Sequence, residues 1–201
     1  MYEFILKGGY LMWPILICSI ASIAILLERI WTLRLSNVLP NKFISQVENL
    51  VDENKISEAH TLCTSNESAI ARVLTAGFEV QTSSRDMIKE RVEGSGRREA
   101  MRLERFLNIL NAIAGVAPLI GLLGTVLGMI EVFSRIEATG SGNIKVISGG
   151  IYSALITTVA GLSVAIPTFL FARYLEGRID GLVSNLEEVS LRIVDKFKKD
   201  K

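Results

Sequence analysis

The chain has 201 residues, with 22 lysines and arginines against 21 aspartates and glutamates, and a formal net charge of +1. Hydrophobic residues make up 49% of it, and its mean hydropathy is +0.38. The near-zero charge argues against a nucleic-acid partner, and the hydropathy argues against an ordinary soluble domain. Because the apolar residues lie in three blocks separated by charged sequence, we predict a membrane protein with a substantial aqueous part.

The first apolar block covers residues 10–27 and is just long enough to cross a bilayer once the preceding glycine pair is added. A cleavable signal peptide needs a basic start and a small-residue cleavage motif, and neither is present around this block. Aromatic residues are enriched at membrane–water interfaces, so we expect Tyr10 and Trp13 near one interface and Trp31 near the other. We therefore expect a retained first membrane-spanning helix over 10–27.

The charged region after the first block has apolar residues at helical spacing. A helix is predicted soon after Pro40, and shorter helices are predicted over 57–63 and 69–80. From residue 85 the helical pattern continues into the second apolar block, although Gly94 and Gly96 weaken it locally. We therefore expect one unbroken helix over 85–133, about 70 Å long at 1.5 Å per residue.

The single histidine and the two cysteines do not form a metal or disulfide pattern. His60 lies in a polar helical segment, so we interpret it as a surface or packing residue. Cys18 lies in an apolar block and Cys63 in a charged one, so a disulfide between them is not expected. Phosphate-binding, zinc-protease and nucleophile-elbow motifs are also missing. We expect no metal, no cofactor and no catalytic residue, and interpret the chain as a non-enzyme.

Small residues recur at helical spacing along the second apolar block, 106–130, and the third, 146–172. A lipid-facing helix gains nothing from small side chains, whereas a helix that must approach a neighbour closely does. We therefore predict helix-packing and oligomer contacts along two stripes, formed by Ala117, Gly121, Gly124 and Gly128 in the second block and by Gly150, Ala154, Gly161 and Ala165 in the third.

Four hydroxyl residues, Thr125, Ser153, Thr157 and Thr158, lie near the middle of these two blocks. Such hydroxyls often bond to carbonyls of their own helix, but together they could line a narrow ion pathway. No Asp, Glu, Lys, Arg or His lies inside 10–27, 106–130 or 146–172. Because hydroxyls cannot store a proton charge at neutral pH, we expect a proton-conducting assembly to take its titrating group from another polypeptide.

The C-terminal tail continues the third block as a helix. Its apolar residues are spaced by alternating steps of four and three, as in a heptad seam; they are Leu175, Ile179, Leu182, Leu186, Val189 and Ile193. Two interpretations remain open: the seam packs against the protein's own cytoplasmic helices, or against copies of the same chain.

The basic residues predict the orientation of the three spans. The long loop after the first span carries 12 Lys/Arg and the tail from residue 173 carries seven, whereas the loop over 131–145 carries two. The positive-inside rule therefore places the N-terminus outside and both large polar parts in the cytoplasm.

With these features, the chain resembles the MotA/TolQ/ExbB proton-channel family, and most closely its ExbB/TolQ branch. The matching motifs are APLIGLLGTVLGMI at 117–130 and GGIYSALITTVAGLSVAIP at 149–167, supported by KISEAHTLC at 55–63 and by Glu28–Arg29. The resemblance implies an all-α integral membrane protein with three transmembrane helices, two of them extended into a cytoplasmic helical region, that forms a homo-oligomeric ring.

The resemblance also implies partners and a role. Members of this branch form a ring, typically a pentamer, around helices of a single-span ExbD- or TolR-like protein that carries an intramembrane aspartate. Ion flow then drives work on a TonB- or TolA-like protein, for outer-membrane import or envelope maintenance. We favour the import role. The alternative is a non-conducting scaffold ring that anchors a single-span partner in the lipid bilayer.

One position departs from the family pattern. Many members carry a glutamate in the third span, two residues after a Gly-Ile pair, and here Ser153 stands at that place. The departure brings the chain nearer to flagellar-stator-type members, in which the partner's aspartate titrates. Since hydroxyls and carbonyls also ligate sodium, both proton and sodium remain compatible with this pattern.

The predicted organisation follows in chain order: a periplasmic N-terminus over 1–9, a first span over 10–27, a cytoplasmic helical region over 28–105, a second span over 106–130, a periplasmic loop over 131–145, a third span over 146–172 and a cytoplasmic C-terminal helix over 173–201.

Overall fold

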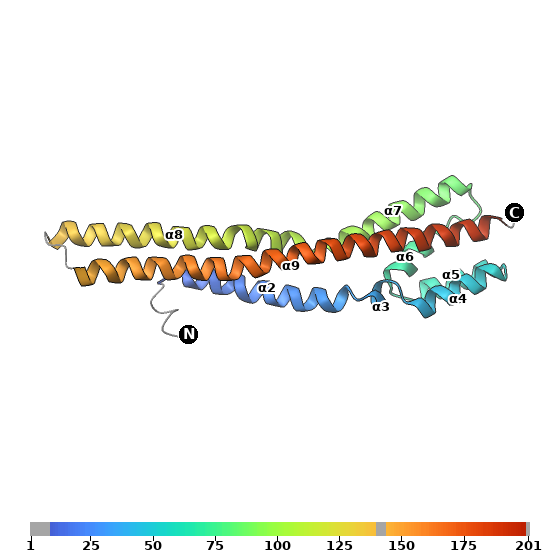
Figure 1. The fold of residues 1–201 in the computed structure, drawn as a ribbon. Helices are drawn as coiled ribbons and strands as arrows, with labels where there is room; N and C mark the ends of the chain where they lie inside the picture. The colour runs from blue at the N-terminus through green and yellow to red at the C-terminus, as the bar shows by residue number, and fades with distance from the viewer. Residues whose placement is uncertain (1–8, 140–143, 200–201) are drawn as a thin grey trace. The chain divides into compact units, whose positions relative to one another are not determined.

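The protein, seen in a computed structural model that describes residues 9–139 and 144–199, is built of α-helices (Figure 1). The described ranges contain no strand, which confirms the all-α prediction. The helices are α2 (Met12–Thr32), α3 (Leu35–Val38), α4 (Asn41–Asp52), α5 (Ile56–Thr64), α6 (Ala69–Phe78), α7 (Arg85–Glu104), α8 (Leu107–Thr139) and α9 (Ile144–Lys199). The predicted N-terminal segment up to residue 8 and the middle of the predicted loop, 140–143, lie outside the described residues.

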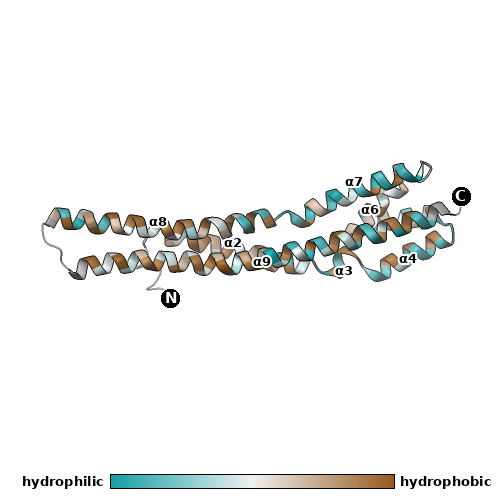
Figure 2. Cartoon of the chain, turned by 45° about the horizontal axis from the view of Figure 1, so that its top comes forward, coloured by the Kyte–Doolittle hydropathy of each residue, from teal (hydrophilic) through white to brown (hydrophobic). Residues whose placement is uncertain are grey.

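Three helical stretches are long and apolar enough to cross a membrane, as the sequence predicted. They lie within Met12–Thr32, Arg85–Ala138 and Ile147–Lys196, the second of which includes α7, the turn after it and most of α8. Figure 2 shows hydrophobic residues concentrated along α2 and α8, while α7 is mainly hydrophilic. Chain contacts divide the protein into two compact units, Met1–Leu27 with Phe106–Tyr174, and Glu28–Arg105 with Leu175–Lys201. We call these the spanning unit and the polar unit.

The polar unit has its own hydrophobic core. Helix α4 buries Phe43, Ile44, Val47 and Val51, and α6 buries seven of its ten residues. The heptad seam of α9 joins this core, since Leu175, Ile179, Leu182, Leu186 and Ile193 are each at most 4% exposed. The seam therefore packs against the chain's own helices, which is the first of the two interpretations left open by the sequence.

The prediction of one unbroken helix over 85–133 is wrong in one respect. Helix α7 ends at Glu104 and α8 begins at Leu107, with a two-residue turn between them. The Arg105 amide donates to the carbonyl of Arg102, three residues back, which tightens the last turn of α7. Neither Gly94 nor Gly96 interrupts α7, so the break is not at the residues with the weakest helix propensity.

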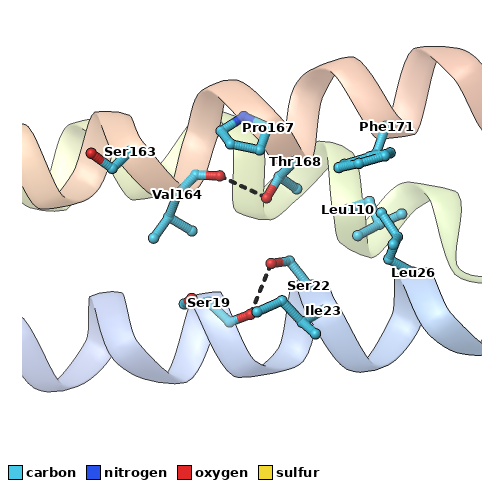
Figure 3. Close-up of a pocket in the computed structure, with 10 residues that line it drawn as sticks. All are labelled: Ser19, Ser22, Ile23, Leu26, Leu110, Ser163, Val164, Pro167, Thr168 and Phe171. Carbon is cyan, nitrogen blue, oxygen red and sulfur yellow. Dashed lines mark hydrogen bonds between the residues drawn. The ribbon is translucent and has the colours of Figure 1, made fainter.

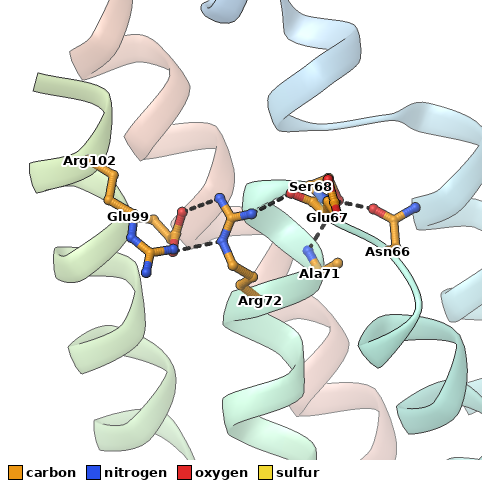
Figure 4. A network of polar contacts seen from close by, with 7 residues as sticks. All are labelled: Asn66, Glu67, Ser68, Ala71, Arg72, Glu99 and Arg102. Carbon is orange, nitrogen blue, oxygen red and sulfur yellow. Dashed lines mark hydrogen bonds and ion pairs between the residues drawn. The ribbon is translucent and has the colours of Figure 1, made fainter. Parts of the chain in front are cut away.

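A buried carboxylate joins α6 to α7 within the polar unit (Figure 4). Glu99 is 3% exposed, and its oxygens accept from Arg72 at 2.9 and 2.5 Å and from Arg102 at 2.9 Å. Arg72 also donates to the backbone carbonyl of Glu67, and the Glu99 carboxylate raises the pKa of the Arg72 guanidinium. A buried carboxylate is tolerated only with such pairing, so this network locks α6 against α7.

His60 is a packing residue, as expected from its helical setting. Its ring lies edge-on to Phe78, with ring centroids 6.4 Å apart.

Cys63 should be almost inert towards thiol reagents in the folded chain. It is 1% exposed, and burial raises the pKa of its thiol from 9.0 to about 12. Because the thiolate is the reactive form, maleimide labelling of Cys63 at pH 8 should be about a thousandfold slower than in the unfolded chain. The rate is measured by mass spectrometry on a Cys18→Ser chain with and without denaturant, and equal rates would contradict the prediction.

The same shift predicts a direction for the effect of pH on stability. Since the folded chain holds the Cys63 proton more tightly than the unfolded chain, the thiol destabilises the fold increasingly as pH rises from about 9 towards 12.

Candidate functional site

Within the spanning unit, α8 and the first part of α9 run side by side in opposite directions (Figure 1). Their register follows from what a Cβ on each glycine would meet. A Cβ on Gly121 would lie 2.8 Å from the Thr157 carbonyl oxygen, and one on Gly128 would lie 2.8 Å from the Ala154 Cβ. A Cβ on Gly161 would lie 2.5 Å from the Ala117 carbonyl oxygen. Residue numbers of the contact partners increase along α8 while they decrease along α9, so the two helices are antiparallel.

The two small-residue stripes therefore face each other within one chain. Gly124 lies against the Thr157 side chain, where an added Cβ would be 2.7 Å from the Thr157 Cβ, and Gly150 lies against Val132. Ala117, Ala154 and Ala165 are each at most 4% exposed. Close backbone approach explains why these positions are small. Contacts between copies of the chain, which the stripes were also expected to make, are not needed to account for them.

Two of the four predicted pathway hydroxyls meet at one backbone carbonyl on the neighbouring helix. Thr158 Oγ1 donates to the Gly121 carbonyl oxygen at 2.9 Å. Thr157 Oγ1 lies 3.4 Å from the same oxygen and 2.7 Å from the Ala154 carbonyl on its own helix. Thr157 is 2% exposed, whereas Thr158 is partly exposed. A side chain at position 121 would fill this space, so glycine there allows the contact.

The other two hydroxyls do not join this contact in the same way. Thr125 Oγ1 donates to the Leu122 carbonyl on its own helix at 2.7 Å, which is the local bonding that such residues often show. Ser153 is partly exposed on α9, one turn before Thr157. The predicted group of four is therefore a pair, Thr157 and Thr158, with Thr125 and Ser153 on nearby turns.

The chemistry available at this contact is that of neutral oxygens. Hydroxyl and carbonyl groups can hold water or ligate a cation, but they cannot take up and release a proton at neutral pH. Glu131, an acidic residue of α8, lies beyond the predicted span and pairs with Arg135 at 2.6 Å. Across the parts of the chain that the structure describes, no group of three His, Cys, Asp or Glu could hold a metal ion.

A cavity of about 170 Å³, which was not predicted from the sequence, lies between α2, α8 and α9 (Figure 3). Its lining is mostly apolar, with four hydroxyl residues, Ser19, Ser22, Ser163 and Thr168. Ser22 donates to the Ser19 carbonyl at 2.9 Å, and Thr168 donates to the Val164 carbonyl at 2.7 Å. Pro167 has no amide proton for the carbonyl four residues earlier, that of Ser163. This Ser-x₃-Pro-Thr pattern in a span was the available sequence signal.

Comparison with known proteins agrees with this architecture. A family model described as the MotA/TolQ/ExbB proton channel family matches residues 65–188. A putative biopolymer transport protein, ExbB-like 1, from Synechocystis sp. is 34% identical over 85% of this chain and 68% of its own length. A second Synechocystis protein, ExbB-like 3, is 30% identical over 83% of this chain and 80% of its own length.

A relative from a different organism covers a similar share of the chain. The biopolymer transport protein exbB1 of Vibrio cholerae is 30% identical over 89% of this chain and 80% of its own length. The family match includes the whole of α8 and the paired part of α9, so it covers both walls of the threonine–glycine contact. The chain belongs to the MotA/TolQ/ExbB proton channel family.

Proposed function

We propose that the chain is the ring-forming subunit of an inner-membrane ion-driven motor that works with an ExbD- or TolR-like single-span partner. The observation that carries the proposal is the close α8–α9 pair, in which Thr157 and Thr158 meet at the Gly121 carbonyl. A polar contact of neutral oxygens between two apolar helices can form one wall of an ion path, but it needs a titrating group from elsewhere.

The partner's intramembrane aspartate is the group we assign to this role. Burial away from water favours the protonated form of a carboxyl, and hydroxyl donors favour its ionised form, so both forms can exist at this contact. Thr158 has a single hydroxyl proton, which it donates either to the Gly121 carbonyl or to an ionised carboxylate. A protonated carboxyl would instead donate to the Thr158 oxygen. The hydrogen bonding of Thr158 would thus change each time the carboxyl takes up or releases its proton.

The orientation follows from charge. Arginines flank the inner ends of the apolar blocks, and the positive-inside rule places them in the cytoplasm with the N-terminus in the periplasm. In this topology the polar unit is cytoplasmic, and a carboxylate that alternately faces each side of the membrane couples ion flow to movement of ring against partner.

The output of the motor is movement passed to a TonB- or TolA-like protein. The names of the relatives, biopolymer transport proteins of the ExbB type, support the import role over envelope maintenance. Proton is the coupling ion that we propose, in keeping with the family description.

The test has two parts. Native mass spectrometry of the chain co-expressed with its single-span neighbour should show a pentamer that holds one or two partner copies. Proton flux into vesicles should then disappear when the partner's aspartate is replaced by asparagine. A monomer that never captures the partner would refute the motor, and an intact complex without flux would instead identify a non-conducting scaffold ring.

A further inference from the structure

One side of α7 carries arginines at intervals of seven residues. Arg91 and Arg98 on the helix and Arg105 at its end are exposed, and two exposed methionines lie between and beyond them on the same side, Met87 at 54% and Met101 at 63%. Steps of four and three keep these residues within a narrow arc of the helix surface. We call Met87, Arg91, Arg98, Met101 and Arg105 the basic stripe.

The polar part of α9 carries an exposed acidic face. Asp180 and Glu187 are seven residues apart, the same interval as the arginines of the basic stripe, and Glu188 adjoins them. The helix surface beside Asp180 is open, because a Cβ on Gly177 or Gly181 would meet nothing within 4 Å. The open glycines let another helix approach this face closely. The acidic face is defined by Gly177, Asp180, Gly181, Glu187 and Glu188.

Among the described residues, Arg91 and Arg98 form no ion pair, and neither do Asp180, Glu187 and Glu188. Other charges on the same two helices are paired, as Arg85 is with Asp195 at 2.6 Å, Arg102 with Glu99 at 2.9 Å and Arg192 with Glu48 at 3.0 Å. Lone surface charges are common, so a contact between the two surfaces also requires that they lie at matching positions along the helix axes.

Contacts within the polar unit give the relative heights of α7 and α9. Arg85 pairs with Asp195, and Gly96 lies beside Leu186, where an added Cβ would be 3.8 Å from Leu186 Cδ2. The two helices are therefore antiparallel. We use height for the position along the helix axis. In this register Arg98 is level with residues 182–184 of α9, and Arg91 is level with residues 189–191. The subunits of a ring are related by rotation about a common axis. Where that axis is parallel to the helices, the rotation leaves these heights unchanged.

The basic stripe and the acidic face are thus at matching heights in neighbouring copies. Arg98 falls between Asp180 and Glu187, and Arg91 falls closest to Glu188. The offsets are one to five residues, or about 2–8 Å along the axis, which a long guanidinium side chain spans. Because both surfaces repeat every seven residues, a single register pairs both arginines at once.

We propose that the basic stripe of α7 in one copy docks on the acidic face of α9 in the next copy. The contact joins two different surfaces, so it is heterologous and closes into a ring by rotation. It rests on the ring of the proposed function and adds to it a specific contact between cytoplasmic helices. Each exposed pair is weak, but every interface of the ring repeats the set, and like charges placed opposite each other are strongly unfavourable.

Charge reversal with rescue tests the contact. Arg98→Glu should reduce the ring fraction about tenfold in native mass spectrometry at low salt, and Asp180→Arg with Glu187→Arg should do the same. A chain with all three changes should recover the ring, because the charges are exchanged rather than lost. Lys42→Glu is the control, since this exposed lysine lies on α4, outside both surfaces, and its charge reversal should leave the ring intact.

Cross-linking provides a readout that does not depend on ring stability. In chains lacking Cys18 and Cys63, one copy carrying Arg98→Cys and another carrying Asp180→Cys should be joined by a short bismaleimide. Neither chain alone should give a comparable covalent dimer, because a heterologous contact does not bring identical positions together.

The outcomes separate this contact from the proposed function. A wild-type chain that forms no ring would refute the proposed function and this contact with it. A wild-type ring that is unchanged by Arg98→Glu, and in which the mixed chains are not cross-linked, would refute the contact alone.

Discussion

Gly124→Leu should separate α8 from α9 and destabilise the spanning unit by about 3 kcal/mol or more, because an overpacked helix contact cannot relax without moving backbone. Even the first added carbon would lie 2.7 Å from the Thr157 Cβ, and three more carbons would follow it. The effect should already be present in the single chain, as a lower thermal unfolding temperature of the detergent-purified protein. Loss of the ring should follow from it.

Gly115→Leu is the matched control for this prediction. Gly115 lies on the same helix, but a Cβ there would meet nothing within 4 Å, so leucine should be accommodated within the chain. Gly124→Ala should fall between the two, since it adds only the Cβ. If Gly124→Leu and Gly115→Leu unfold at the same temperature, the intrachain packing described for α8 and α9 does not carry the stability of this unit.

Thr158→Val should lower ion flux by about tenfold to a hundredfold while leaving assembly unchanged. Valine keeps nearly the same volume but removes the hydroxyl that donates to the Gly121 carbonyl at 2.9 Å. A hydrogen bond to a charged group contributes about 1.5–3 kcal/mol, whereas the neutral bond seen here contributes about 1 kcal/mol. The loss should therefore be larger for the step that involves the partner's carboxylate than for folding. Proton flux into vesicles containing the chain and its partner gives the measurement.

Thr168→Val serves as the comparison for Thr158→Val. The Thr168 hydroxyl donates to the Val164 carbonyl on its own helix at 2.7 Å, within the cavity between α2, α8 and α9. Thr168→Val therefore removes a hydrogen bond to a backbone carbonyl, as Thr158→Val does, but at the cavity and not at the threonine–glycine contact. Equal flux in the Thr158→Val and wild-type complexes, or an equal loss in both variants, would argue against a specific role for Thr158.

Much of the fold could be predicted because it depends on residues close together in sequence. Apolar blocks of sufficient length predicted the three spans, and spacing of three and four residues predicted helices in the positions of α4, α5 and α6. The same spacing predicted the small-residue stripes and the heptad seam of α9. Periodicity identifies which face of a helix packs, because residues of the same kind at helical spacing all lie on one side of the helix.

The tertiary structure alone decided what each of those faces packs against. The stripes of α8 and α9 meet each other in one chain, and the α9 seam is buried on the chain's own helices rather than left for another copy. Thr125 and Thr158 look alike in sequence, yet one hydroxyl bonds its own helix and the other reaches the neighbouring helix at Gly121. The cavity beside Pro167 likewise needs three helices to exist. Sequence spacing describes each helix singly, whereas partner, register and enclosed space are properties of helix pairs, and these depend on contacts between residues far apart in the chain.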